Sequence, residues 1–274
     1  MNQESIQSLA VNILSSRKYR DLGLPVETVC NLLEQELSRH RSQKDALDAV
    51  RQKLHNIVAP YLGDPDYPEA ARKLEQAFAS PDPEAVRQAC RATLAAHAST
   101  RERLALLDGF YSRLWQVTGL PRTLLDLACG LHPFSFLWMR LPLSTCYYAY
   151  DIVRPRVDLI NRYFSLQGLQ PLAAVQDILI EPPAVEADVA LFFKEAHRFE
   201  QRQHGCNRPF WQALRVSWLL VSLPTESLAK KHNLLEGHRR LVYNTLDGLN
   251  WPVTELEFEG EIVFCIETGI KRET

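Results

Sequence analysis

The 274-residue sequence lacks several features that would place it in a special class of protein. Its six cysteines include no pair at C-x-x-C spacing, so it offers neither a zinc ribbon nor a disulfide framework, and we expect reduced thiols and no bound metal. The N-terminus lacks a basic start followed by an apolar run, and no stretch approaches about 18 uninterrupted apolar residues, which argues against a signal peptide and a membrane span. The 31 Lys and Arg against 33 Asp and Glu give a net charge of −2, which excludes a strongly basic nucleic-acid coat but leaves room for a local basic patch. We therefore expect a cytoplasmic protein.

Helical periodicity fills the first hundred residues. Apolar residues recur on one helical face over residues 26–37 and again over 47–58. The second helix should end before Pro60, because a proline disfavours helical geometry at the preceding residue. An Asp-Pro pair predicts a capped helix over 83–96, and the S-T-R-E run at 99–102 is a capping-box pattern.

The character of the sequence changes at residue 123. Short apolar runs alternate with helix-length segments: TLLDLACG, CYYAYDI, ADVALFFK and SWLLVSLP. This alternation is typical of a parallel sheet in an α/β domain, and the closing VTELEFEG-EIVFCIETG predicts two strands joined by a tight Glu-Gly turn. We expect a helical domain over residues 1–100 and an α/β, Rossmann-like domain over residues 101–274.

Small residues and acids follow the predicted strands where a ligand would bind. Ala128, Cys129 and Gly130 follow the first strand and let a ligand approach the backbone. The stretch lacks G-x-G-x-x-G and is too poor in glycine for a Walker loop, which disfavours a phosphate-cradling site. Asp151 ends the second strand, where an acid commonly binds ribose hydroxyls, and Asp177 offers an acceptor for an adenine amine. A single acid of this kind is more often a cap or turn residue, but the ordered set predicts S-adenosylmethionine and a methyltransferase.

Two motifs resemble a known family. The runs HASTRERL at 97–104 and DLACGLHP at 126–133 resemble the aminoglycoside-resistance 16S rRNA methyltransferases, the Arm/Rmt and actinomycete self-resistance group. The similarity extends over most of the chain, from SRKY at 16–19 to LPTESL at 223–228. It implies a helical rRNA-docking domain joined to a Rossmann-like S-adenosylmethionine-dependent domain. It also implies methylation of N7 of guanosine 1405 in 16S rRNA of the 30S subunit, which confers aminoglycoside resistance.

This chemistry needs no catalytic acid or base. Guanine N7 carries a free lone pair and no proton, so attack on the sulfonium methyl depends on alignment. Arg103 is expected to hold the methionine carboxylate as a charge-assisted fork. The resemblance implies the following cofactor-binding residues: Tyr61, His97, Ala98, Ser99, Arg103, Ala128, Asp151, Asp177, Ile178, Phe193 and Arg202.

The chain departs from the family pattern near the expected cofactor. The family usually has Asn where this chain has His132, and Gln where it has Arg202. It usually has Leu-Pro where Glu195-Ala196-His197 follow Lys194.

A larger departure lies in the expected target loop. After the P-T-x-S-L turn the family has a glycine- and basic-rich segment, whereas this chain reads AKKHNLL at 229–235. Lys230 and Lys231 keep the positive charge, but the glycines are absent. The departure therefore affects the predicted target nucleotide more than the predicted cofactor binding. The alternatives are an RNA methyltransferase acting on another nucleotide and a non-catalytic ribosome-binding relative.

Basic side chains are expected to contact rRNA phosphates in a salt-sensitive way. Residues 17–53 hold eight basic and six acidic residues, so a mixed, solvated surface is the alternative interpretation of that segment. We expect the protein to be a monomer. The predicted RNA-binding residues are Arg17, Lys18, Lys53, Lys194, Lys230 and Lys231.

Overall fold

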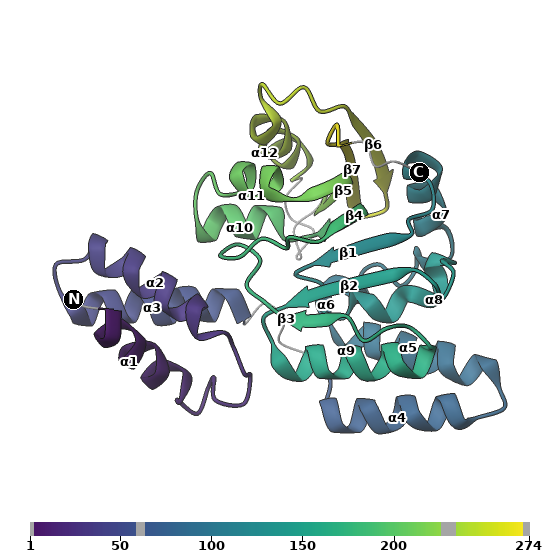
Figure 1. The fold of residues 1–274 in the computed structure, drawn as a ribbon, viewed down its shortest axis with the longest axis horizontal. Coiled ribbons are helices and arrows are strands. Elements are labelled where there is room, and N and C mark those ends of the chain that lie inside the picture. The colour runs from purple at the N-terminus through teal and green to yellow at the C-terminus, as the bar shows by residue number, and fades with distance from the viewer. Residues whose placement is uncertain (1–2, 59–63, 226–233, 271–274) are drawn as a thin grey trace.

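A seven-stranded sheet forms the centre of the computed structural model, which describes residues 3–58, 64–225 and 234–270 (Figure 1). The strand order is β3-β2-β1-β4-β5-β7-β6. The strands are β1 (Thr123–Leu127), β2 (Cys146–Asp151), β3 (Ala173–Val175), β4 (Glu186–Phe193), β5 (Arg215–Pro224), β6 (Val253–Phe258) and β7 (Glu261–Glu267). Strands β1 to β5 are parallel, and β7 runs antiparallel to both β5 and β6. The strand order reverses direction between β1 and β4, which is the position where open α/β sheets bind ligands at their carboxyl edge.

The predicted strands are confirmed with small shifts. The first apolar run continues one residue past Asp126, and the second ends at Asp151 as expected. The predicted closing hairpin is β6 and β7, and Gly260 lies in their turn at φ +73°. Glycine suits this turn because a positive φ costs it no steric strain.

The N-terminal half contains helices α1 (Gln3–Leu14), α2 (Val26–Arg39), α3 (Gln43–Val58), α4 (Tyr67–Ala79) and α5 (Pro83–Ala96). The described part of α3 reaches Val58, and the predicted helix end before Pro60 lies outside the described residues. The predicted Asp-Pro cap of α5 is present, since an Asp82 carboxylate oxygen accepts the backbone N–H of Glu84 at 2.9 Å. The later helices are α6 (Ala98–Arg101), α7 (Leu107–Thr118), the 3-10 turn η2 (His132–Ser135), α8 (Phe136–Met139), α9 (Arg154–Gln167), α10 (Ala196–Arg202), α11 (Asn207–Ala213) and α12 (Leu235–Leu246).

The capping box predicted at residues 99–102 is wrong. Helix α6 already begins at Ala98, so Ser99 lies inside its first turn instead of before it. The Ser99 hydroxyl hydrogen-bonds Nδ1 of His97 at 2.9 Å, and Glu102 accepts from Lys194 at 2.5 Å instead of reaching back to a backbone N–H. A local neighbour, His97, therefore holds Ser99, and a distant residue, Lys194, holds Glu102, so neither side chain caps the helix.

Buried side chains divide the chain before α4. Helices α1–α3 enclose their own cluster, which includes Val29, Leu33 and Leu54. Helices α4 and α5 instead contribute Leu74 and Leu94 to the cluster beneath the sheet. Figure 1 accordingly shows α1–α3 to one side of the sheet, and α4, α5 and α9 packed together near β3 and β2. The functional division at residue 100 stays a prediction.

The opposite face of the sheet is covered by α10, α11 and α12, and Trp211 is fully buried there. Among the described helices, none has the length and apolar character needed to cross a membrane.

Candidate functional site

The candidate site is a cavity of about 490 Å³ at the carboxyl edge of β1, β2, β3 and β4. This volume falls within the range of about 300–1,000 Å³ that small-molecule sites occupy. The cavity brings together five of the predicted cofactor residues, which are Ala128, Asp151, Asp177, Ile178 and Arg202. Helix α3 forms another wall with Lys53, Asn56, Ile57 and Val58. The helical unit α1–α3 thus contributes directly to the site.

Asp151 is buried at the end of β2 and anchors the turn that follows β1. One carboxylate oxygen accepts the Gly130 backbone N–H at 3.0 Å, and the other accepts that of Val153 at 2.9 Å. Arg156 donates to both oxygens at 2.9 Å and to Asp64 at 2.6 Å. Arg156 could not be predicted from the sequence, because an arginine in the first turn of a helix is usually exposed to solvent. In the structure it is only 1% exposed.

Asp177 also lines the cavity and holds a bidentate contact with Arg202. The two nitrogen–oxygen distances are 2.9 and 2.6 Å. Thr28 of α2 donates its hydroxyl to the same carboxylate at 2.8 Å. Arg202 therefore lies at the predicted site, but its partner in this structure is Asp177, and no sequence signal pointed to Thr28.

A narrow cleft adjoins the cavity on the other side of the β1 turn. Its free volume of about 10 Å³ is that of a single water molecule. Gly130 lies in this turn at φ +55°, and a Cβ added there would come 3.2 Å from His97 Cε1. The predicted cofactor residues among its lining are His97, Ser99, Arg103, Ala128 and Phe193. Ala98 begins α6 beside them.

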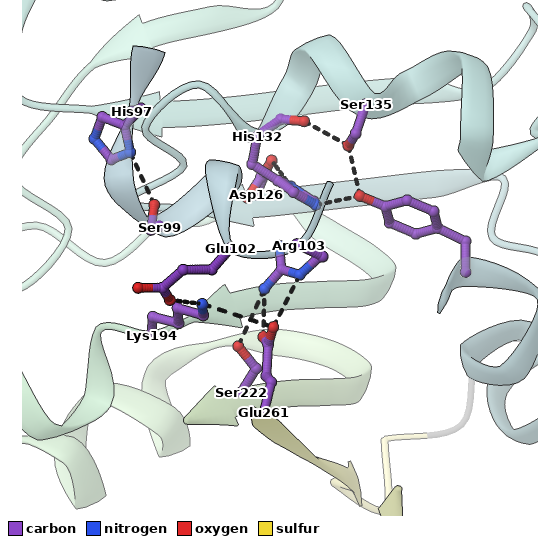
Figure 2. Close-up of polar contacts among 11 residues, drawn as sticks. His97, Ser99, Glu102, Arg103, Asp126, His132, Ser135, Lys194, Ser222 and Glu261 are labelled. Atoms are coloured by element: carbon purple, nitrogen blue, oxygen red, sulfur yellow. Dashed lines mark hydrogen bonds and ion pairs between the residues drawn. The ribbon is translucent and has the colours of Figure 1, made fainter. Parts of the chain in front are cut away.

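Arg103 forms a buried fork with a protein carboxylate (Figure 2). Its expected contact with the methionine carboxylate stays a prediction. Its Nε lies 3.1 Å from Glu261 Oε2, and its Nη2 bonds Glu261 Oε1 and, at 3.5 Å, the Ser222 hydroxyl. The guanidinium also lies over the rings of Phe110 and Phe193, 4.6 and 4.5 Å from their centroids. This arrangement fixes Arg103 in place before any ligand binds.

Lys194 joins the same cluster, which places it differently from the surface RNA contact that the sequence predicted. Its side chain is 8% exposed, and its ammonium lies 2.5 Å from Glu102 and 3.8 Å from Glu261. Burial alone would raise the pKa of Glu261, but Arg103 and Lys194 lower it to about 2. In the described structure Lys194 is therefore part of a buried charge cluster.

His97 is fully buried against the Gly130 turn. Burial, assisted by the charge of Arg156, lowers the pKa of His97 to about 3. The imidazole is therefore neutral at pH 7.

A polar network joins the end of β1 to the residues that follow its turn (Figure 2). His132 Nδ1 lies 2.7 Å from Asp126, and its Nε2 lies 2.7 Å from the Tyr111 hydroxyl. Tyr147 also donates to Asp126 at 2.7 Å, and Tyr111 donates to Ser135 at 2.5 Å. His132, one of the departures from the family pattern, is thus bound through both ring nitrogens and buried.

The predicted RNA-binding residues of the helical unit lie in two different settings. Arg17 and Lys18 are exposed after α1, and Lys18 Nζ lies 2.8 Å from His55 Nδ1 beside a hollow of about 590 Å³. Lys53 instead binds the buried Glu36 at 2.7 Å and lines the cofactor cavity. Tyr61, Lys230 and Lys231 lie outside the described residues.

All six cysteines are free thiols. Within the described ranges, no group of three or more His, Cys, Asp or Glu side chains could hold a metal ion.

Comparisons with known proteins place these features in context. The family described as Ribosomal RNA methyltransferase (FmrO) matches residues 15–264. A 16S rRNA (guanine(1405)-N(7))-methyltransferase of Serratia marcescens is 34% identical over 234 residues, which cover 85% of this chain and 86% of that protein. A protein of the same name from Frankia casuarinae is 29% identical over 269 residues, covering 96% and 94%. The crystal structure of the 16S rRNA methyltransferase RmtF in complex with S-adenosyl-L-homocysteine gives a TM-score of 0.81 at 29% identity, covering 97% of this chain and 99% of that one. The similarity spans the helical unit and the sheet alike.

Proposed function

Because the chain belongs to the ribosomal RNA methyltransferase (FmrO) family, we propose that it is a 16S rRNA (guanine(1405)-N(7))-methyltransferase. It transfers the methyl group of S-adenosylmethionine to that guanosine in the 30S subunit. The observation that carries the proposal is the pair of adjoining spaces at the β1–β4 reversal, one lined by two buried aspartates and the other by a buried arginine. The RmtF complex with S-adenosyl-L-homocysteine supports the same cofactor.

The residues present suit the two ends of this cofactor. Asp151 and Asp177 are the carboxylates proposed to accept ribose hydroxyls and an adenine amine, and Arg103 is proposed to give a carboxylate the N–H donors that Glu261 and Ser222 leave unused. A carboxylate has about four acceptor positions, and Asp151 already receives four contacts from Gly130, Val153 and Arg156. Ribose binding at Asp151 therefore requires Arg156 to release at least one of its contacts. Asp177 already receives four contacts as well, so Arg202 or another partner has to release it. The cleft beside Arg103 also has to widen beyond its free volume of about 10 Å³ to admit the amino-acid end. The roles of the individual residues remain part of the proposal.

The chain has to align the reactants and exclude water. S-adenosylmethionine supplies a methyl group on a positively charged sulfur, and guanine N7 supplies a lone pair with no proton to remove. Fixed geometry at the reacting centre is then the main source of rate. The β1 turn provides this fixed geometry. Asp151 holds the turn through the Gly130 backbone N–H, and Asp126 and His132, which precede and follow the turn, hydrogen-bond to each other.

Docking on the 30S subunit is assigned to the helical N-terminal region, predicted as residues 1–100. The exposed Arg17 and Lys18 are positioned to contact rRNA phosphates. Lys230 and Lys231, beyond the described residues, are proposed to contact the target region. We propose further that the protein acts as a monomer on ribosomal subunits in the cytoplasm.

The proposal is tested with purified protein, labelled S-adenosylmethionine and 30S subunits from cells that lack this modification. We expect one methyl group per subunit, located at N7 of guanosine 1405 by mass spectrometry of nuclease fragments. Subunits already methylated at that position serve as the control and should accept none. Expression should also protect cells against gentamicin and kanamycin.

The other outcomes separate the alternatives. A methyl group at a different position would identify an RNA methyltransferase with another target. Binding of cofactor and 30S subunits without any methylation would identify a non-catalytic relative.

A further inference from the structure

Glu195 occupies the junction of the two spaces in the candidate site. It follows the end of β4 by two residues, and it lines both the 490 Å³ cavity and the narrow cleft, as Ala128 does. Its side chain is buried, with the residue 7% exposed. Glu195 also belongs to the segment where the sequence departs from the Leu-Pro usual in the family. The proposed reaction assigns no role to this carboxyl group.

The junction is where the charged sulfur of the donor has to lie, if the proposed function holds. The nucleoside end is assigned to the cavity with Asp151, and the amino-acid end to the cleft with Arg103. The sulfonium connects these two ends covalently. It must therefore lie between the cavity and the cleft, beside the residues that line both.

Glu195 has a cationic partner in the following helix. Arg198 of α10 lies 3.3 Å from its carboxylate. Arg198 also donates to the α3 backbone carbonyls of Asn56 at 3.0 Å and Ile57 at 3.4 Å, so its charge is shared. The other charged or titratable residues that line the two spaces are Lys53 of α3, His97, Arg103, Asp126, His132, Asp151, Arg156, Asp177, Lys194, His197 and Arg202.

We propose that Glu195 is the anion that recognises the sulfonium charge, so that the protein binds S-adenosylmethionine in preference to S-adenosylhomocysteine. The reaction itself conserves charge. The N7 lone pair forms the new N–C bond, the C–S bond breaks with its electron pair passing to sulfur, and the positive charge moves onto the guanine ring. A carboxylate at the junction faces a cation before and after transfer, whereas it gains nothing from the neutral thioether. Glu195 thereby favours release of the spent cofactor.

The protonation of Glu195 gives this recognition a pH dependence. Burial raises the pKa of its carboxyl to about 7, against the lowering effect of Arg198. The group is mostly neutral at pH 6 and mostly ionised at pH 8. If only the ionised form attracts the sulfonium, the preference for the charged ligand should rise about tenfold between these pH values, following the ionised fraction.

The test is calorimetric titration of the purified protein with S-adenosylmethionine and with S-adenosylhomocysteine at pH 6 and pH 8. The two ligands share their amino and carboxylate groups, so the titration of those groups cancels in the ratio of the two dissociation constants. We expect the ratio in the parent protein to favour S-adenosylmethionine and to increase about tenfold from pH 6 to pH 8. In Glu195→Gln the ratio should fall at least tenfold at pH 8 and lose its pH dependence.

Two further variants separate charge from structure. Glu195→Asp keeps the charge and should retain part of the preference. Glu186→Gln removes an exposed carboxylate at the opposite end of β4 and should behave as the parent does. Melting temperatures of all variants are measured alongside.

Each other outcome has a definite meaning. An unchanged ratio in Glu195→Gln, or an equal loss of both ligands, overturns the assignment of Glu195 while leaving the proposed cofactor in place. If the parent binds neither ligand, the proposed function fails, and the inference fails with it.

Discussion

Replacing Glu261 with glutamine should cost the protein several kcal/mol of stability. Glu261 is 2% exposed at the start of β7 and accepts two hydrogen bonds from Arg103, with Lys194 3.8 Å away. The substitution keeps the shape of the side chain and removes its charge. Two cationic groups in a buried cluster would then lose the anion they share.

Two independent arguments give similar magnitudes. The pKa of Glu261 is lowered from 4.5 to about 2, and at about 1.4 kcal/mol per unit this corresponds to roughly 3 kcal/mol of folding free energy at pH 7. Removing one partner of a buried ion pair typically costs about 3–5 kcal/mol, because the other charge stays buried. We expect Glu261→Gln to lose about 3 kcal/mol, since the amide oxygen still accepts one hydrogen bond.

Urea denaturation at several pH values measures this loss. The pKa of Glu261 is lower in the folded state, so its stabilisation is complete above about pH 4.5 and disappears as the pH falls toward 2. The difference between parent and variant should therefore shrink to about half at pH 3. Glu186→Gln, which removes one partner of an exposed pair with Arg215, is the matched control and should cost about 0–1 kcal/mol. A loss below about 1 kcal/mol for Glu261→Gln, or one independent of pH, would refute the reasoning.

Three further changes test other parts of the site. Asp151→Asn should weaken S-adenosylmethionine binding by about 1.5–3 kcal/mol, the range for hydrogen bonds to a charged group; unchanged affinity in calorimetry would reject its assignment to ribose. Replacing Arg17 and Lys18 together with glutamate should weaken 30S binding and lower its salt dependence without changing cofactor affinity; equal 30S binding at several salt concentrations would remove this patch from the interface. Gly130→Ala adds a Cβ 3.2 Å from His97 at φ +55° and should lower stability by about 1–2 kcal/mol; a melting temperature equal to that of the parent would show that the turn accommodates it.

Sequence reasoning succeeded where the signal is local. Strand β2 and its terminal Asp151 could be predicted because an apolar run and the residue that ends it are adjacent in the chain. The same holds for the α5 cap, where Asp82 accepts the backbone N–H of Glu84, two residues along the chain. Parallel strands then bring such local features to one edge of the sheet, so Asp151 and Asp177 could be expected to line one site.

The partners of the charged residues could not be predicted in this way. Arg103 and Glu261 are 158 positions apart, so no local sequence pattern connects them. Their pairing becomes evident only in the folded chain. Lys194 was predicted to bind RNA, and no local pattern indicated that Glu102 and Glu261 would hold its ammonium group in a buried cluster. Arg202 was predicted to contact the cofactor, whereas in the structure its guanidinium binds Asp177.

Helices α1–α3 are not a separate module that could be exchanged without affecting the cavity. Lys53, Asn56, Ile57 and Val58 of α3 form part of the cavity wall, and Thr28 of α2 reaches Asp177. A fragment that begins after α3 would therefore lack one side of the 490 Å³ cavity, which we propose holds the nucleoside, and would leave apolar surface open to water. Replacing these helices in evolution would have to rebuild one wall of the cavity at the same time.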